Sequence, residues 1–274
     1  MSKTTQDRHP AQVPVPPTGS DDKHARIMAV TSGKGGVGKT FLAANLAAAL
    51  AALGERVLVL DADLGLANLD VVLNLYPKTT LHDVFTGKAT LDEAIIPAPG
   101  NFSVLLAGSG LVEYSRLTTD VREKLLQVIA TVKPQFDRIL LDTGAGISDV
   151  VLYAVSLATE VLLVTTPEPT SMTDAYATIK VLASQQRRGV IQLVVNQVTR
   201  PGEGRAICAQ LQLVVDRFVN PEAPTPVKLM LAGEIPTDPV VREAVQGRQL
   251  LVEVYPGAPA AKAVKAVATK LAHA

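Results

Sequence analysis

Short apolar segments alternate with longer segments of helical character along the chain from Arg26 onward. Such alternation is typical of βαβ units, in which crossover helices join parallel strands. We therefore expect an α/β fold, with a mostly parallel, doubly wound central sheet flanked by helices on both faces. The predicted strands are Ile27–Thr31, Arg56–Leu60, Phe102–Leu106, Arg138–Leu141, Glu160–Thr165, Ile191–Val195 and Lys228–Ile235.

The predicted helices differ in how their apolar residues are distributed. The first, Phe41–Leu53, is rich in Ala and Leu all round and ends at Gly54, which predicts a buried helix. Another is expected to begin with Thr170 as its N-cap and Asp174 in its first turn, where a negative charge is favourable. The remaining helices are predicted at Thr118–Val132, Arg205–Phe218 and Pro259–Ala272.

The two parts of the chain differ in composition. Residues 1–24 are rich in proline and polar residues and show no period, which predicts a disordered arm. Residues 25–274 show no internal repeat and no sign of a second domain, so one domain is expected. No signal peptide and no apolar run of about 18 residues is found, which predicts a cytoplasmic protein.

The charge of the chain limits its contacts with nucleic acid and lipid, and its cysteine content limits disulfide formation. The 26 basic and 26 acidic residues cancel, so any contact with nucleic acid or anionic lipid must be local. An apolar fraction of 47% supports a sizeable core. The single cysteine, Cys208, cannot form a disulfide within the chain.

A glycine-rich loop directly follows the first predicted strand. Its spacing, Gly33-x-x-x-x-Gly38-Lys39-Thr40, matches the P-loop pattern, in which backbone N–H groups and a helix N-terminus hold phosphate. The lysine reaches the β and γ phosphates, and the threonine hydroxyl binds Mg²⁺. This predicts the three-layer sandwich of P-loop NTPases. The loop residues expected to bind nucleotide are Gly33, Lys34, Gly35, Gly36, Val37, Gly38, Lys39, Thr40 and Phe41.

The same glycines also satisfy a second pattern. Gly33-x-Gly35-x-x-Gly38 fits the dinucleotide fingerprint, and Asp61 lies near the offset expected for a ribose-binding carboxylate. An oxidoreductase is therefore an alternative. Lys39 and Thr40 favour the triphosphate site, because a dinucleotide site has no use for them.

Polar residues follow several of the predicted strands and should meet at the carboxyl edge of the sheet. Asp61 and Asp142 are expected to join Thr40 at the Mg²⁺ ion, the aspartates through water. Asp63 is the candidate to orient the attacking water, with Lys34 and Lys39 on the phosphates as the other catalytic residues. The segment Leu64-Gly-Leu-Ala-Asn68 is expected to move as a switch. The alternative for a strand-end aspartate is a turn or cap residue.

The loop Lys34-Gly-Gly-Val-Gly-Lys-Thr40 resembles the deviant Walker A motif of the MinD/ParA family of ATPases. The resemblance implies an ATP-sandwich homodimer, in which Lys34 reaches the ATP of the partner subunit. It also implies that Glu168 and Asp174 hold Lys34 when the γ-phosphate is absent. A solvated loop lysine is the alternative.

The resemblance extends to other parts of the site. It implies that Asn196, with the backbone of Pro236 to Asp238, lies against adenine, and that Asn68 belongs to the switch and dimer interface. Related ATPases that carry iron–sulfur clusters need paired cysteines, which this chain lacks.

Within that family the chain resembles FlhG regulators of flagellar number. The resemblance spans residues 26 to 274 and implies an ATP-driven monomer–dimer switch that acts on the GTPase FlhF, on C-ring components or on a flagellar transcription activator. The segments that carry it are Asp61–Asp70, Thr80–Val84, Gly108–Gly110, Leu141–Ser148 and Thr166–Tyr176.

Three features depart from the family pattern. Phe41 replaces a polar residue that contacts the α-phosphate, although its backbone N–H can serve. The N-terminal arm lacks the Asp-Gln-Ala motif through which many FlhG proteins stimulate FlhF, which puts that activity in doubt. The last helix has an apolar face and lysines but no bulky aromatics, so it is either a weak membrane anchor or a helix packed on the sheet. Its face is Val264, Val267 and Leu271, and its lysines are Lys262, Lys265 and Lys270.

Two further functions remain as alternatives. A ParA-type DNA-segregating ATPase would need a local basic patch, for which Arg187, Arg188, Arg200 and Arg205 are the candidates. Such arginines are also common on a solvated face, so DNA is not the expected partner. A MinD-type regulator of the cell-division site would bind membrane through the last helix.

Overall fold

The computed structural model describes residues 25–64, 68–108 and 117–273. The predicted N-terminal arm lies outside the described residues. So do Gly65, Leu66 and Ala67 of the expected switch segment, and Ser109 and Gly110 of one of the motifs.

One eight-stranded sheet organises the described residues, in the order β3-β4-β2-β5-β1-β6-β7-β8. The β3–β4 pair is antiparallel, and the other pairs of neighbours are parallel. The expected α/β class is confirmed. The strands are β1 (Arg26–Ser32), β2 (Val57–Ala62), β3 (Ile95–Ala98), β4 (Phe102–Leu105), β5 (Arg138–Ala145), β6 (Glu160–Thr165), β7 (Val190–Val198) and β8 (Lys228–Pro236).

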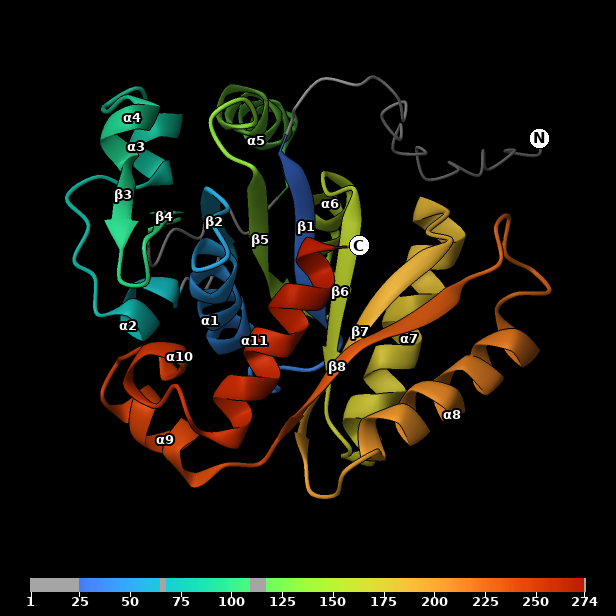
Figure 1. Ribbon diagram of the computed structural model, residues 1–274. Coiled ribbons are helices and arrows are strands. Elements are labelled where there is room, and N and C mark those ends of the chain that lie inside the picture. Colours follow the sequence, from blue (N-terminus) through green and yellow to red (C-terminus); the bar gives the residue numbers. More distant parts are fainter. Residues whose placement is uncertain (1–24, 65–67, 109–116, 274) are drawn as a thin grey trace, which may run out of the picture.

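The central strands are apolar over most of their middle residues because both faces of the sheet are covered. One face packs against α1 (Lys39–Ala51), α2 (Leu69–Leu73), α10 (Leu251–Val254) and α11 (Pro259–Ala272). Figure 1 shows α1 and α11 crossing this face in front of the strands.

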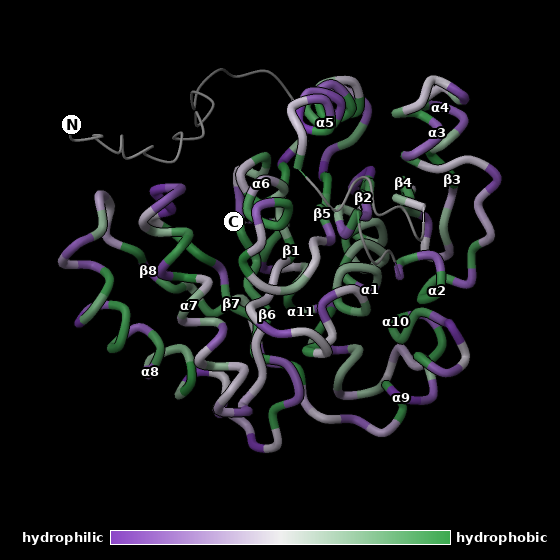
Figure 2. The backbone as a smooth tube through the Cα atoms, turned by 180° about the vertical axis from the view of Figure 1, so that it is seen from behind, coloured by the Kyte–Doolittle hydropathy of each residue, from purple (hydrophilic) through white to green (hydrophobic). Residues whose placement is uncertain are grey.

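The opposite face packs against a second group of helices, which come forward in the view from behind (Figure 2). They are α3 (Leu81–Phe85), α5 (Thr119–Val132), α6 (Asp149–Ser156), α7 (Pro169–Gln186) and α8 (Glu203–Phe218). The layers are therefore helix, sheet, helix, as the P-loop fold predicts. Hydrophobic residues, coloured green, lie along the inner strands, and many hydrophilic residues, coloured purple, lie in the outer turns (Figure 2).

The edge strand β3 was not predicted from the sequence. It is short and contains Pro97, which removes a backbone donor and marks an edge position. It returns to β4 through a turn in which Gly100 and Asn101 have positive φ angles. The short helix α4 (Leu91–Ala94), with a capping box between Thr90 and Glu93, leads into it.

The start of α7 differs from the prediction. The helix begins at Pro169 with Glu168 as its N-cap, so Thr170 lies inside the first turn and Asp174 lies beyond it. Proline explains the shift, because its fixed φ suits the first helical position and its missing N–H costs nothing there.

The last helix packs on the sheet rather than presenting its apolar face outward. Val264, Val267 and Leu271 are at most 1% exposed, and the helix lies against α1 and β8. The apolar face that a weak membrane anchor would need is therefore buried within the fold. Across the described ranges, no helix combines the length and apolar character needed to cross a bilayer.

Candidate functional site

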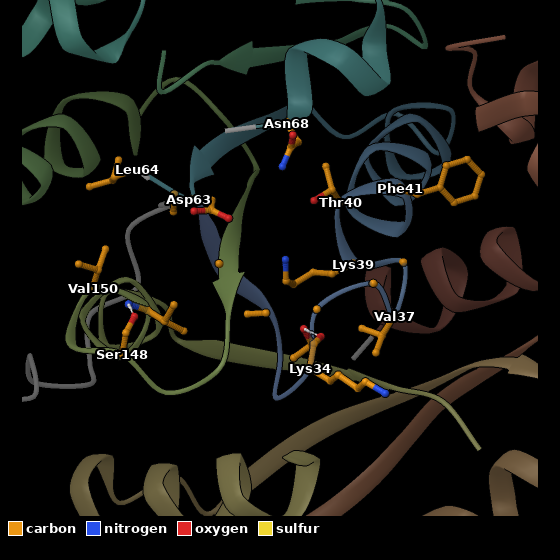
Figure 3. Close-up of a pocket in the computed structure, with 18 residues that line it drawn as sticks. Lys34, Val37, Lys39, Thr40, Phe41, Asp63, Leu64, Asn68, Ser148 and Val150 are labelled. Atoms are coloured by element: carbon orange, nitrogen blue, oxygen red, sulfur yellow. Dashed lines mark hydrogen bonds between the residues drawn. The ribbon is translucent and has the colours of Figure 1, made fainter. Parts of the chain in front are cut away.

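The glycine-rich loop joins β1 to α1 at the carboxyl edge of the sheet and opens onto a cavity of about 510 Å³ (Figure 3). Gly36 and Gly38 have φ angles of 79° and 89°, a region that disfavours side chains. A Cβ on Gly33 would overlap the main-chain carbonyl of Asp174, and one on Gly38 would strike the Asn196 amide. These glycines are needed for conformation and for close packing.

Lys39 and Thr40 begin α1, and both lie near Asp142, which is inside β5. The Nζ of Lys39 lies 3.8 Å from Oδ1 of Asp142, and the Thr40 side chain acts on the same carboxyl by lowering its pKa. Burial raises the pKa of Asp142 to about 6, although Lys39 and Thr40 act in the opposite direction. The structure thus brings together the lysine, hydroxyl and carboxylate that the sequence predicted.

Asp61 lies beside Asp142, because β2 pairs in register with β5 at these two positions. Its carboxyl is 1% exposed, and its Oδ1 accepts a hydrogen bond from the backbone of Asp63 at 3.1 Å. Burial, followed by the charge of Asp142, raises its pKa well above the ordinary range. Neither of these two carboxyls lines the phosphate cavity, whereas Thr40 and Asp63 line it directly.

This donor set fits a magnesium ion. Oδ2 of Asp61 and Oδ1 of Asp142 are buried oxygens without a hydrogen-bond partner in the described structure. Buried acceptors of this kind are costly unless water or a cation satisfies them. Oxygen ligands from carboxylates and hydroxyls, with retained waters, are what Mg²⁺ prefers. Thr40, Asp61 and Asp142 would therefore hold Mg²⁺, which would neutralise phosphate charge.

Asp63 faces the phosphate cavity with Asn68 across from it (Figure 3). Gly144 at the end of β5 leaves room for it, since a Cβ there would lie 3.4 Å from the Asp63 carboxyl carbon. A carboxylate that lines the cavity near Lys39 and Thr40 is placed to orient a water molecule for attack on a phosphate. Its catalytic role remains a prediction.

The side chain of Lys34 turns away from Lys39 (Figure 3) and bonds to the start of α7. Its Nζ donates to Oε1 of Glu168 at 2.6 Å and to Oγ1 of Thr170 at 2.7 Å. Thr170 in turn donates to Glu168 at 2.8 Å. The hydrogen bond from Lys34 lowers the pKa of Glu168. We call this group of three residues the lysine clasp.

The clasp contains one predicted partner, Glu168, and one that the sequence reasoning missed. Thr170 was read as an N-cap, and only the observed start of α7 places its hydroxyl beside Lys34. Asp174 contributes through its backbone, which packs on Gly33. Within the described ranges the hydrogen bonds of the Lys34 ammonium go to Glu168 and Thr170, so a switch role for the Asp174 carboxyl remains a prediction.

A second cavity of about 310 Å³ adjoins the phosphate cavity and shares Gly38 and Phe41 with it. Asn196, Pro236 and Asp238 all line it, as expected for a base-binding site. Nδ2 of Asn196 donates to the Val37 carbonyl at 2.8 Å, which ties β7 to the loop. We call this the base cavity.

The helix α9 (Pro239–Gln246), which the sequence reasoning did not predict, forms part of the base cavity. Its only sequence signals are Asp238 followed by Pro239, an N-cap and a proline at the first helical position. Asp238 accepts hydrogen bonds from Val240 at the start of α9 and from Ala260 at the start of α11. Its carboxylate therefore fixes two helices around the cavity.

The four arginines considered for DNA binding do not form one patch. Arg187 and Arg188 precede β7, whereas Arg200 and Arg205 follow it, and a nine-residue strand separates the pairs by roughly 30 Å. Arg188 also donates to the carbonyls of Val155 and Ala158 near the end of α6. These four arginines therefore do not provide the single local patch on which the DNA-binding alternative relies.

Comparison with known proteins identifies the family. A ParA family model, described as an NUBPL iron-transfer P-loop NTPase, matches residues 23–272. The antiactivator FleN of Pseudomonas aeruginosa is 44% identical over 246 residues, which cover 90% of this chain and 86% of FleN. The flagellum site-determining protein YlxH of Helicobacter pylori is 33% identical over 85% of this chain and 77% of its own length.

A solved structure agrees with these sequence matches. The septum site-determining protein MinD of Pyrococcus horikoshii, complexed with Mg-ADP, superposes with a TM-score of 0.72 at 30% identity, covering 90% of this chain and 96% of MinD. The sequence matches, the shared fold and the loop with its two lysines lead to one conclusion. The chain belongs to the MinD/ParA family of P-loop NTPases and is a homologue of the antiactivator FleN and of the flagellum site-determining protein YlxH.

Proposed function

We propose that this protein is a Mg²⁺-dependent ATPase that acts as an ATP-driven monomer–dimer switch in the control of flagellar number and placement. ATP binding assembles the dimer, and hydrolysis returns the chain to the monomer. The support comes from the loop and carboxyls of the site and from the relationship to FleN and YlxH.

The lysine clasp is the observation that carries the switch. Lys34 is directed out of its own phosphate cavity, and its positive charge is held by Glu168 within the same chain. A second copy that presents a γ-phosphate would offer this lysine an anion of higher charge. Because charge-assisted bonds to phosphate are strong, the lysine would leave the clasp and cross to the partner's ATP.

Each residue then has a definite task in hydrolysis. Lys39 and the loop N–H groups bind and orient the phosphates, and Lys34 of the partner adds charge stabilisation at the transferred group. Asp63 orients the attacking water. Thr40, Asp61 and Asp142 would hold Mg²⁺, which would neutralise charge on the phosphates. Phosphoryl transfer requires little covalent chemistry from the protein, so this set is sufficient.

The flagellar role is proposed from the relatives. FleN is an antiactivator and YlxH determines flagellum sites, so we propose that the ATP dimer of this protein binds a flagellar transcription activator, C-ring components or the GTPase FlhF. Iron transfer, named in the description of the family model, is not proposed because the chain has a single cysteine, and that residue is buried in α8.

Size-exclusion chromatography with ATP tests the switch. Asp63→Ala should bind ATP but fail to hydrolyse it, and therefore should accumulate as a dimer. Lys39→Ala should lose ATP binding and remain a monomer, which makes it the matched control. If Asp63→Ala binds ATP and still elutes as the monomer, the ATP-dimer proposal is wrong.

A further inference from the structure

The ring of Phe41 points away from the phosphate cavity. Phe41 directly follows the phosphate-binding threonine, yet its side chain points away from Lys39 and Thr40 toward the C-terminal segments coloured red (Figure 3). It lines the base cavity together with Val241 and Val245 of α9. The ring therefore lies where the loop passes from the phosphate site to the site of the base.

Two polar side chains that line the base cavity, those of Asn196 and Asp238, are already bonded within the protein. The amide of Asn196 donates to the Val37 carbonyl at 2.8 Å and accepts from the backbone of Gln197 at 2.9 Å. Both oxygens of the Asp238 carboxylate accept from helix N-termini. Groups that are bonded within the protein gain little by bonding to a ligand. A bound base would therefore gain little from these two side chains, and contact with its faces becomes an important source of affinity.

We propose that the Phe41 ring is the platform on which the purine base of the bound nucleoside triphosphate stacks. The proposal rests on the nucleotide-binding function proposed above and assigns the base contact to a side chain. An aromatic ring suits this role because every base has a π face, and stacking on an aromatic side chain is a substantial part of base affinity. The substitution that removes a polar phosphate contact thus supplies a base contact.

Asn45 positions this ring. It is fully buried in α1, where its Nδ2 donates to the Phe41 carbonyl at 2.8 Å. Its Oδ1 accepts from the backbone of Val252 in α10 at 3.1 Å. The backbone of Phe41 is thereby fixed to the segment α9–α10 that closes the base cavity. Asn45 is a positioning residue in this arrangement.

Binding measurements with two ligands test the proposal. Calorimetry would give the affinity of the wild type and Phe41→Leu for ATP and for inorganic tripolyphosphate, both with Mg²⁺. Leucine preserves an apolar contact with the core but removes the ring. We expect roughly tenfold weaker ATP binding, as the loss of one stacking contact implies, and unchanged tripolyphosphate binding. Phe41→Tyr should restore ATP affinity.

Phe218→Leu is the matched control, because Phe218 is an exposed phenylalanine at the end of α8. It should leave both affinities unchanged. Equal ATP affinity in Phe41→Leu and the wild type would overturn the stacking role. So would an equal loss for tripolyphosphate, since the substitution would then act through the loop. A wild-type protein that binds tripolyphosphate but not ATP would overturn the proposed ATPase function itself.

Discussion

Gly33 shows how closely the phosphate loop is packed at the scale of single residues. Its missing side chain allows the loop to approach the main chain of Asp174 in α7. Gly35, two residues later, has no neighbour within 4 Å of the position that a Cβ would take. The two glycines therefore serve different purposes, and only Gly33 occupies a fixed position of the P-loop pattern.

This contrast predicts different thermal stabilities. Gly33→Ala should lower the free energy of unfolding by roughly 1–3 kcal/mol, because an added methyl must displace backbone in a tightly packed site. Gly35→Ala should change it by less than about 0.5 kcal/mol. Thermal unfolding without nucleotide measures both. Equal stability of the two variants would show that the loop does not pack on α7 as described.

The lysine clasp makes a second prediction at the residue scale. Glu168→Gln and Thr170→Val should release Lys34 and allow ATP to assemble the dimer at several-fold lower concentration. Thr173→Val is the control, because Thr173 lies on the same helix and its hydroxyl bonds to the Pro169 carbonyl instead. An ATP titration followed by light scattering measures the shift. Dimerisation at unchanged ATP concentration would remove the clasp from the switch.

The clasp also depends on pH in a definite direction. The bond from Lys34 lowers the pKa of Glu168 in the folded protein. The ion pair therefore makes its full contribution above the ordinary pKa of a glutamate and loses it as pH falls through the lowered value. The wild type and Glu168→Gln should accordingly need different ATP concentrations to dimerise at neutral pH. This difference should disappear in acid.

At the scale of elements, a buried ion pair joins the starts of β2 and β5. Arg138 is 1% exposed, and its guanidinium donates to Glu55 at 2.6 and 3.1 Å and to the carbonyl of Leu271 at the end of α11. Arg26 of β1 donates to the same carbonyl at 3.2 Å. Two strands thus hold the last turn of the C-terminal helix.

Removing one partner of this ion pair should lower the stability of the folded protein. Glu55→Ala would leave a buried guanidinium without its carboxylate, which we expect to destabilise the protein by about 3–5 kcal/mol. Asp120→Ala removes the exposed i, i+4 pair with Lys124 and should cost less than about 1 kcal/mol. Urea unfolding measures both variants. A small effect of Glu55→Ala would mean that water reaches Arg138.

The sequence predicted the elements whose pattern is long or chemically marked. The parallel strands and the helices α1, α5, α8 and α11 were found because their apolar runs and periods extend over many residues. The helices α9 and α10 were missed, since segments of eight and four residues carry too few turns to show a period. These two short helices help to enclose the base cavity.

Among the site residues, too, only those marked by a local sequence pattern could be predicted. Lys39, Thr40 and Asp142 were predicted because a local motif and a strand end place them. Thr170 and Asn45 were not, because their partners lie 136 residues away in sequence or in the unpredicted α10. No local pattern encodes a contact that depends on how two distant elements pack.

At the scale of the whole molecule, the fold leaves the phosphate cavity open and turns the Lys34 ammonium away from Lys39. The formal net charge of zero provides no repulsion between two copies. Lys34 is held at the outer end of the loop rather than beside Lys39. We therefore expect that a second copy facing this edge covers the cavity and completes the site.

The most direct test compares the single variant Asp63→Ala with the double variant that also carries Lys34→Ala. Light scattering in saturating Mg-ATP measures the mass of each. Both variants should bind ATP, since Lys39, Thr40 and the glycines of the loop are unchanged and Lys34 turns away from Lys39. The account predicts about twice the chain mass of 28.8 kDa for Asp63→Ala and a single chain mass for the double variant. A double variant that still dimerises would contradict the crossing lysine, and a monomeric Asp63→Ala that binds ATP would contradict the switch.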